Sequence, residues 1–288
     1  MLSVIAAYAQ LPFELVNMQL HTVRNAAARG ALCNDGSPAT FYFRDCPRPA
    51  SECAQFTTDW FVVFADGDSS DACYDKMTCT ARKAAAAGKM SSAGLNATLL
   101  SPAGLFSYSG EENPNFYGYR TVLVPYCSSD MWLGNASAID LHFRGRAIAA
   151  AIMEDLASIT FSPVSVPTIY GPGPNQTRLD EADSLTLVGN AGILHQLGNL
   201  AALVPSRPAK QLKAICDGCV LPAVKPLVSV TERPCTSAAD CPPPVVLQRG
   251  LHLWEPSTSW QELQADSLLP AVKLPLLVQQ PQVSSPMC

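Results

Sequence analysis

Short apolar runs, each about as long as one strand, alternate along the chain with segments whose apolar residues recur at helical spacing. Continuous apolar runs of this length are typical of strands that are covered on both faces. The helical segments are 76–89, with an alanine-rich interior, and 144–159, with Ile148, Ile152 and Leu156 on one face. The strand-like runs are 41–43, 59–65, 121–126, 185–188, 212–216 and 274–278. This alternation predicts an α/β fold with a mostly parallel sheet and helices on both faces.

The pattern offers no internal repeat and no boundary at which to divide the chain, so residues 15–288 are interpreted as a single domain. Residues 1–14 are interpreted as the remnant of a signal or leader segment, because Ala7-Tyr8-Ala9 has the small-x-small form of a cleavage site. The same stretch has no basic start and only a short apolar core, so an apolar packing segment is the alternative.

Composition narrows the cellular setting. Apolar residues make up 48% and charged residues 15% of the chain, which is typical of a globular protein. A net charge of −5 argues against nucleic acid or an anionic membrane as the main partner. No apolar run reaches the ~18 residues of a membrane-spanning helix, so no transmembrane segment is expected.

Eleven cysteines indicate an oxidising compartment, with a pairing that the sequence leaves open and one thiol left over, for which Cys288 is the candidate. Three glycosylation sequons, at Asn96, Asn135 and Asn175, point the same way. We therefore predict a secreted or lumenal protein with disulfides.

One stretch has the pattern of a sharp strand-to-helix bend. Residues 185–188 form an apolar strand, small residues follow at Gly189, Ala191 and Gly192, and an apolar helical run then begins. This is the small-residue pattern of a nucleophile elbow, the turn that raises a catalytic serine above a sheet, but the serine position is occupied by Asn190. An ordinary strand–turn–helix is the alternative interpretation.

Several blocks, in order along the chain, carry a wider resemblance. They are 31–39, 60–64 with 73–75, 111–116, 125–134 and 143–146, of which Tyr126–Gly134 is the most specific. Together they resemble the Notum/pectin acetylesterase family, carboxylesterases of the α/β-hydrolase type. The similarity extends from about Leu15 to Gln282 and is strong up to about residue 158.

The resemblance implies acyl transfer by a serine, a histidine that takes its proton, an aspartate that orients the histidine, and backbone N–H groups that hold the oxyanion. The nucleophile position corresponds to Asn190, whose neutral amide has no usable nucleophilic lone pair. Asparagine is one of the few non-glycine residues that accept left-handed backbone angles, so we expect it to keep the bend while losing the chemistry. Asp217 corresponds to the acid, with a simple turn aspartate as the alternative. Gly67 and Ala191 correspond to the oxyanion donors, and Tyr126 and Trp132 to residues that line the binding site.

Two further departures from the family weaken the catalytic interpretation. The loop after residue 64 should be rich in glycine, but it retains only Gly67 and carries Asp66, Asp68 and Asp71, which we interpret as a solvated acidic loop. Its spacing suggests Ca²⁺ only superficially, because no bidentate glutamate follows. No metal or cofactor is therefore predicted.

The catalytic base is also expected to be absent. In the family the histidine follows the strand that resembles 274–278, and this chain ends at Cys288 before that segment. We interpret the domain as incomplete at its C-terminal end. The four histidines present, His21, His142, His195 and His252, are interpreted as structural.

The sequence therefore predicts a family member that lacks esterase activity in this form. One alternative is a secreted protein that binds a glycan or an acylated ligand without catalysis. Another is an active serine esterase of which this sequence is an incomplete version, and a third is a fragment that folds poorly. Neither the substrate nor the oligomeric state follows from the sequence.

Overall fold

A computed structural model describes residues 17–45, 59–67, 69–100, 103–158, 178–190, 192–193, 196, 200, 211–217, 250, 253–254 and 276–279. The strands are β1 (Met18–Thr22), β2 (Thr40–Arg44), β3 (Asp59–Phe64), β4 (Thr98–Leu99), β5 (Arg120–Val124), β6 (Ala136–Ala138), β7 (Leu141–Phe143), β8 (Ser184–Gly189), β9 (Gln211–Asp217) and β10 (Leu276–Gln279). The helices are α3 (Lys76–Ala86) and α4 (Gly145–Ser158), with 3₁₀ turns η1 (Ser69–Asp71), η2 (Ala87–Met90), η3 (Gly104–Phe106) and η5 (Leu179–Glu181).

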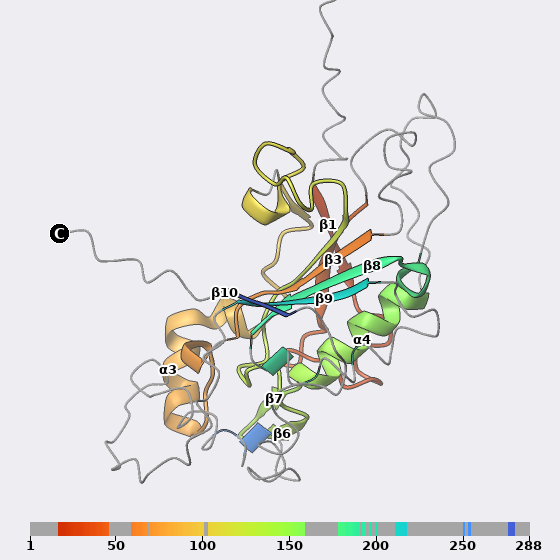
Figure 1. Cartoon of the computed structure of the whole chain (residues 1–288). Helices are drawn as coiled ribbons and strands as arrows, with labels where there is room; N and C mark the ends of the chain where they lie inside the picture. The colour runs from red at the N-terminus through yellow and green to blue at the C-terminus, as the bar shows by residue number, and fades with distance from the viewer. Residues whose placement is uncertain are drawn as a thin grey trace, which may run out of the picture.

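Eight of the described strands form one mixed sheet in the order β10-β9-β8-β3-β5-β2-β1-β4 (Figure 1). Pairing is parallel from β10 to β5, and it is antiparallel from β5 through β2 and β1 to β4. When the sheet is read from β1 toward β10, β5 comes before β3, so these two strands are exchanged relative to their order in the sequence. The α/β class predicted from the sequence is confirmed, and a parallel half with an antiparallel edge is its detailed form.

The sequence pattern located the central elements and missed the peripheral ones. All six predicted strands and both predicted helices are present, with shifts of a few residues at their ends. The helix predicted for 76–89 ends at Ala86 and continues as the 3₁₀ turn η2. Strands β1 and β4 and the β6–β7 hairpin carried too few apolar residues to be recognised.

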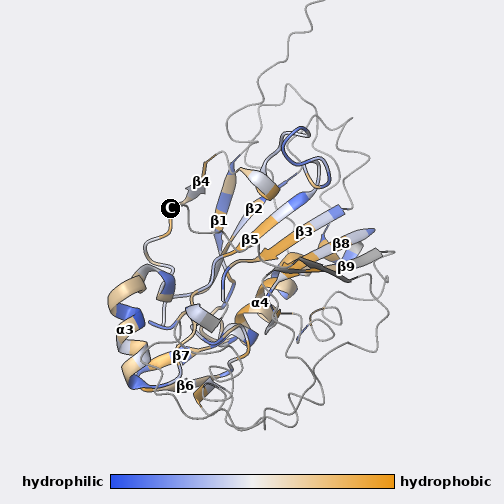
Figure 2. Cartoon of the chain, turned by 60° about the vertical axis from the view of Figure 1, so that its left-hand side comes forward, coloured by the Kyte–Doolittle hydropathy of each residue, from blue (hydrophilic) through white to orange (hydrophobic). Residues whose placement is uncertain are grey.

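The two faces of the sheet are covered differently. On one face α4 packs Ile148, Ile152 and Leu156 into a core that includes Trp60 and Leu187. The strands β3, β5 and β8 and helix α4 are accordingly the most apolar part of the described chain (Figure 2). Burial of a large apolar side chain contributes about 1.5–3 kcal/mol, so this contact is the main source of stability.

The opposite face is covered by the segment 103–119, which Figure 1 shows across the sheet from α4. Its anchor is Phe116, whose ring stacks on Phe61 of β3 with the ring centroids 4.3 Å apart. The buried Asn113 fixes the segment by donating from Nδ2 to the carbonyls of Leu105 and Ser107. Helices on both faces therefore remain a prediction, because the cover on this face is a loop with one 3₁₀ turn.

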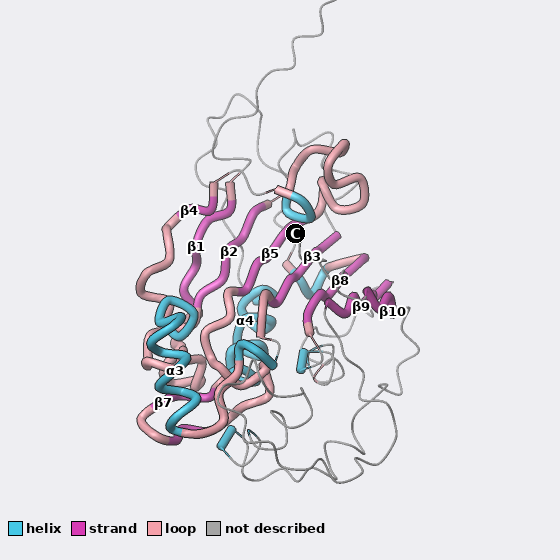
Figure 3. Tube along the Cα trace, turned by 90° about the vertical axis from the view of Figure 1, so that its left-hand side faces the viewer, coloured by secondary structure: helices cyan, strands magenta, loops and turns pink. Residues whose placement is uncertain are grey.

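A second, smaller layer lies beyond the carboxyl ends of β3 and β5, where α3 and the β6–β7 hairpin lie together (Figure 3). Helix α3 begins with a capping box, in which Asp75 Oδ1 accepts from Thr78 N at 2.7 Å and Thr78 Oγ1 accepts from Asp75 N at 3.1 Å. The disulfide Cys73–Cys79 lies within this layer and joins α3 to the segment before it, whereas Cys33–Cys127 joins the turn before β2 to the segment after β5. None of the helices in the described ranges has the length and hydropathy needed to cross a bilayer.

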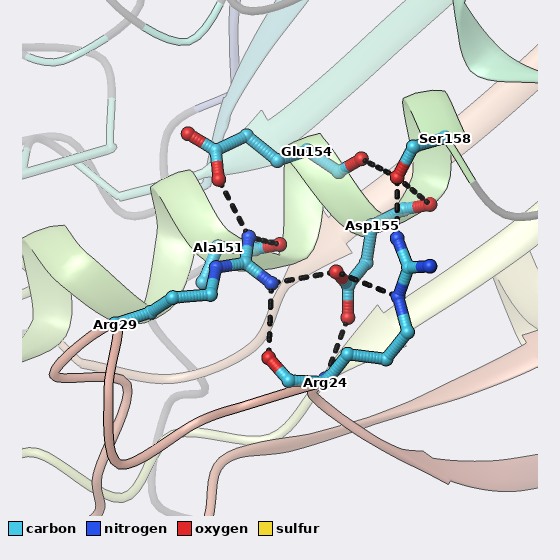
Figure 4. Close-up of polar contacts among 6 residues, drawn as sticks. All are labelled: Arg24, Arg29, Ala151, Glu154, Asp155 and Ser158. Carbon is cyan, nitrogen blue, oxygen red and sulfur yellow. Dashed lines mark hydrogen bonds and ion pairs between the residues drawn. The ribbon is translucent and has the colours of Figure 1, made fainter.

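The turn after β1 is fastened to α4 by a buried carboxylate (Figure 4). Asp155 Oδ1 accepts from Arg29 at 2.6 Å and from Arg24 Nε at 3.4 Å, and Asp155 Oδ2 accepts from the backbone N–H of Arg24 at 2.9 Å. Arg29 also donates to the carbonyl of Ala151 and to Glu154. Asp155 is only 1% exposed, whereas Glu154 is half exposed.

We predict that Asp155→Ala lowers the free energy of unfolding by about 2–3 kcal/mol, because two arginines and one backbone N–H lose a charged acceptor. The matched control is Glu154→Ala at the preceding position of α4. It removes the solvent-screened ion pair with Arg29 and should lower the free energy of unfolding by about 0.5 kcal/mol or less. Urea denaturation measures both. Equal losses for the two variants would mean that the Asp155 contacts do not fasten the turn.

Candidate active site

The predicted elbow lies at the carboxyl edge of the sheet, next to the loop that follows β3. Asn190 comes directly after β8, Gly67 comes three residues after β3, and Asp217 is the last residue of β9. Because β3, β8 and β9 are parallel neighbours, their carboxyl ends share this edge. Ala191 and the side chain of Asp217 lie outside the described part, so their assigned roles stay predictions.

Every polar group of the Asn190 side chain has a partner. Its Oδ1 accepts from the backbone N–H groups of Gly192 at 2.9 Å and Ile193 at 3.2 Å. Its Nδ2 donates to the carbonyl of Gly67 and, at 3.4 Å, to that of Asp66. The two acceptor and two donor contacts fix the orientation of the amide. Asn190 is also buried, so this side chain joins the elbow to the loop after β3.

These contacts change the reason why asparagine suits the bend. Asparagine tolerates left-handed backbone angles, but Asn190 is not among the described residues with positive φ, so the expectation that it keeps the bend in this way is wrong. Instead, acceptance from the second and third N–H groups of the following turn is the geometry of a helix N-cap. Gly192 and Ile193 are helical, and Leu200 N donates to Gln196 O farther along. Asn190 therefore acts as the N-cap of the helical turn that follows the bend.

Gly67 is enclosed on both sides. Its φ of +82° follows Asp66 at +52°, so the loop makes two consecutive left-handed steps. A Cβ atom on Gly67 would lie 2.7 Å from Trp132 Nε1 and 3.0 Å from Tyr126 Cε2. The rings of Tyr126 and Trp132 are both buried, with centroids 5.0 Å apart. Only glycine fits here, and the two aromatic residues predicted to line the site do contact its loop.

The acidic loop is not simply solvated, as the sequence interpretation had it. Asp71 Oδ1 pairs with Arg82 of α3 at 3.0 Å and with Lys89 at 3.4 Å, and Asp66 Oδ2 pairs with Lys89 at 3.3 Å. The side chain of Asp71 is 15% exposed and that of Arg82 is 7% exposed. A long hydrogen bond of 3.5 Å runs from Gly67 N to Asp71 Oδ2.

The loop that carries Trp132 is organised by Asp130, whose side chain is buried. Oδ1 accepts from Ser128 Oγ at 2.6 Å and Trp132 N at 3.0 Å, and Oδ2 accepts from Gly145 N at 2.7 Å and Gly134 N at 3.1 Å. Burial raises the pKa of Asp130 to about 6, although these four donors favour the ionised carboxylate.

The same loop forces positive φ on three residues, Ser129, Met131 and Trp132. It is also held at Tyr126, whose hydroxyl accepts from Met131 N at 2.6 Å. Burial, and secondarily the charge of Asp130, raise the pKa of this hydroxyl well above its ordinary value, so it is neutral. Left-handed angles on bulky residues are costly, and these hydrogen bonds provide the compensation.

The helical turn after Asn190 packs directly on this loop. A Cβ atom on Gly192 would overlap the carbonyl oxygen of Met131, far inside van der Waals contact. Gln196 Nε2 donates to the carbonyl of Trp132 and, at 3.3 Å, to that of Gly192. The small residue at 192, which the elbow pattern includes, is therefore required by a close backbone approach.

The remaining predicted residues lie away from this edge or outside the described ranges. His21 of β1 stacks on Phe41 of β2, with the two ring centroids 5.5 Å apart. His142 pairs across the β6–β7 hairpin with Ser137, with 2.9 Å between Nδ1 and Oγ. His195 and His252 are not described, nor is Asn175, whereas Asn96 and Asn135 are exposed. Across the described chain, no group of three potential metal ligands is close enough to hold an ion.

Sequence reasoning missed the basic partners of the acidic loop. Arg82 and Lys89 are seven residues apart, two helical turns, so they share one side of the predicted helix. This spacing could have indicated that the two cations face the same partner. Arg82 also donates from Nε to Ser129 Oγ at 2.8 Å, which links α3 to the Asp130 loop.

We predict that Asn190→Asp costs more stability than Asn190→Ser. Aspartate keeps the capping acceptor but turns an N–H donor into an oxygen that faces two carbonyls, for an expected loss of about 2–3 kcal/mol. Serine also caps helices well and should cost about 1 kcal/mol. Chemical denaturation of both variants measures the difference. Equal losses would indicate that the Nδ2 contacts contribute nothing.

A second prediction concerns Gly192. Gly192→Ala should lower the free energy of unfolding by about 2–3 kcal/mol, because the new methyl group overlaps the Met131 carbonyl. Gly88→Ala is the control: a Cβ there meets nothing within 4 Å, so its change should stay within about 0.5 kcal/mol. Thermal unfolding compares the two. A neutral Gly192→Ala would contradict the packing of this turn on the 131–132 backbone.

The chain is similar in sequence to several known proteins. The chain is 28% identical over 247 residues to palmitoleoyl-protein carboxylesterase notum2 of Xenopus laevis, which covers 83% of this chain and 43% of that protein. It is 24% identical over 243 residues to NOTUM of Mus musculus, covering 83% and 42%. The chain thus spans about two fifths of the length of these curated relatives.

A third relative carries a different description. The inactive palmitoleoyl-protein carboxylesterase notum1b of Danio rerio is 33% identical over 123 residues, which is 43% of this chain and 78% of that protein. The pectinacetylesterase family model matches residues 13–163, just over half of the 288 residues. That range includes β3, α3, the Asp130 loop and α4. The chain therefore belongs to the Notum/pectin acetylesterase family.

Proposed function

We propose that this chain is a non-catalytic member of its family, one that keeps an α/β-hydrolase type of scaffold, with helices on both faces of the sheet, but has lost ester hydrolysis. The strand order, with β3 and β5 exchanged and an antiparallel edge, supports that scaffold. The bend after β8 persists at the expected place. What differs is the chemistry available at the bend.

The observation that carries the proposal is the state of Asn190. A neutral amide has no usable nucleophilic lone pair, because that of its nitrogen is delocalised into the carbonyl group, so an acyl-enzyme cannot form on it. In addition, its four hydrogen-bond contacts are all directed to the backbone of this chain. A nucleophile must be free to attack, whereas this side chain serves as a structural connector.

The loop after β3 supports the same conclusion through its polarity. An oxyanion is stabilised by N–H donors aimed at the developing charge. Here the carbonyl oxygens of Asp66 and Gly67 point toward the side chain at 190. The N–H of Gly67 has a carboxylate near it instead. Acceptors and negative charge at this position oppose an ester's tetrahedral intermediate.

The proposed remaining role is binding of an acylated protein, with a glycan as the alternative ligand. The relatives whose names specify a palmitoleoyl-protein substrate motivate this ligand class. The apolar groups proposed to lie nearest to the ligand are Tyr126 and Trp132, whose buried rings pack on Gly67. Asp217, at the end of β9, is the proposed remnant of the triad acid.

The proposed location is secreted or lumenal. The two disulfides within the described residues, Cys33–Cys127 and Cys73–Cys79, fit an oxidising compartment. The sequon residues Asn96 and Asn135 are exposed, as glycan acceptors must be, and Asn175 is the third proposed acceptor. A mass shift on glycosidase treatment of protein secreted from eukaryotic cells tests this part.

The catalytic part is tested with a fluorophosphonate probe and p-nitrophenyl acetate hydrolysis. We expect no labelling and no turnover above heat-denatured protein, because loss of a triad nucleophile costs about 10⁴–10⁶ in kcat. Asn190→Ser should remain unlabelled, because the loop still presents acceptors. Labelling that maps to one serine of the wild-type chain, with turnover abolished by its alanine variant, would overturn the proposal.

The binding part uses the same protein in an equilibrium titration. A palmitoleoylated peptide should bind at least about tenfold more tightly than the same peptide without the acyl chain, a difference of about 1.4 kcal/mol. Trp132→Ala should remove this preference, provided that its circular dichroism matches the wild type. Equal affinity for the two peptides would eliminate the acyl ligand.

A further inference from the structure

The carboxylate of Asp71 lies beside a backbone donor, in the position that an oxyanion would take. Oδ2 lies 3.5 Å from Gly67 N, the N–H that corresponds to the family's oxyanion donor. The carbonyl of the same glycine is taken by Asn190. Both polar backbone groups of Gly67 are thus satisfied by side chains of this chain, one on each side of the residue.

Asp71 is held in place by two cations. Arg82 donates to Oδ1 at 3.0 Å from within the core of the second layer, and Lys89 approaches the same oxygen at 3.4 Å. Arg82 is fixed in turn by Ser129, and its NH2 nitrogen is buried without a hydrogen-bond partner. A guanidinium in such surroundings strongly favours an anion at its side.

Of the two described carboxylates of this loop, Asp71 has the stronger contacts. Among the described residues around Gly67, the carboxylates of Asp66 and Asp71 form ion pairs with Arg82 and Lys89. Asp66 contacts Lys89 only through a half-exposed pair, whereas Asp71 contacts Arg82, Lys89 and the Gly67 N–H together. Removal of Asp71 would leave Arg82 without its described carboxylate partner and the Gly67 N–H without its carboxylate contact, and a guanidinium beside a backbone N–H is a combination that binds anions.

We propose that Asp71 acts as a built-in anion that occupies the oxyanion donor and closes the site to external carboxylates and ester oxyanions. This inference rests on the proposed function, since it explains how the site remains closed. The site would accept a small carboxylate once Asp71 is removed. The alternative is that Asp71 serves only as the salt-bridge partner of Arg82, with no effect at Gly67.

The experiment follows the Gly67 amide by ¹⁵N–¹H NMR in the full chain. Asp71→Asn should move the Gly67 amide proton upfield, because a neutral acceptor polarises the N–H less than a carboxylate. In Asp71→Ala the shift should be larger. Titration with sodium formate should then return the signal toward its wild-type position and raise the melting temperature above that in equal sodium chloride.

Formate should bind Asp71→Ala at least about tenfold more tightly than it binds the wild type, a difference of about 1.4 kcal/mol. Asp66→Ala is the matched control, since it removes a carboxylate from Lys89 in the same loop but leaves the Gly67 N–H contact intact. It should gain no formate affinity. Backbone amides of α3 report on whether each variant retains its fold.

Two results would overturn the proposal. One is a Gly67 amide that resonates at the same position in the wild type and Asp71→Asn. The other is formate that stabilises Asp71→Ala without moving the Gly67 signal, which would place the anion at Arg82 alone. If Asp71→Ala does not fold, the Asp71→Asn comparison decides. None of these readouts depends on turnover, so failure here is separate from fluorophosphonate labelling of the wild type.

Discussion

A single buried carboxylate, Asp130, determines where the parts of the site lie. It accepts hydrogen bonds from four donors, three in the turn at residues 128–134 and one at the start of α4. Through that turn it positions Trp132 against Gly67 and the Met131 carbonyl against Gly192. The loop after β3 and the bend after β8 therefore rest on the same support. Asp130 gathers its four hydrogen bonds at the cost of burying a carboxylate, which raises its pKa to about 6.

Much of the fold could be predicted because its central strands are short, continuous runs of apolar residues. Runs such as 59–65 are apolar on both faces, and their short length and aromatic and β-branched residues are typical of a strand between two layers. The edge strands could not be recognised in the same way, since β1 is largely half-buried and β4 has two residues. Their pairing is determined by neighbours far away in the sequence.

The location of the candidate site could be predicted from the sequence, but its hydrogen bonds and ion pairs could not. Gly189 and Gly192 indicated a tight bend, and the bend is present. The sequence could not indicate that Asn190 caps the next turn instead of adopting a left-handed angle, because both roles favour the same residue type. Nor could it pair Asp71 with Arg82, since that contact depends on how α3 lies against the loop.

Asn190 also limits what kind of ligand this edge can recognise. Its acceptor and donor groups are already matched to four backbone groups, so a molecule arriving there would find no unused polar group on this side chain. To bind through hydrogen bonds, such a molecule would first have to break the link between two loops. Selectivity at this edge would therefore have to depend on shape and apolar contact, which discriminates by chain length and volume more than by polar pattern.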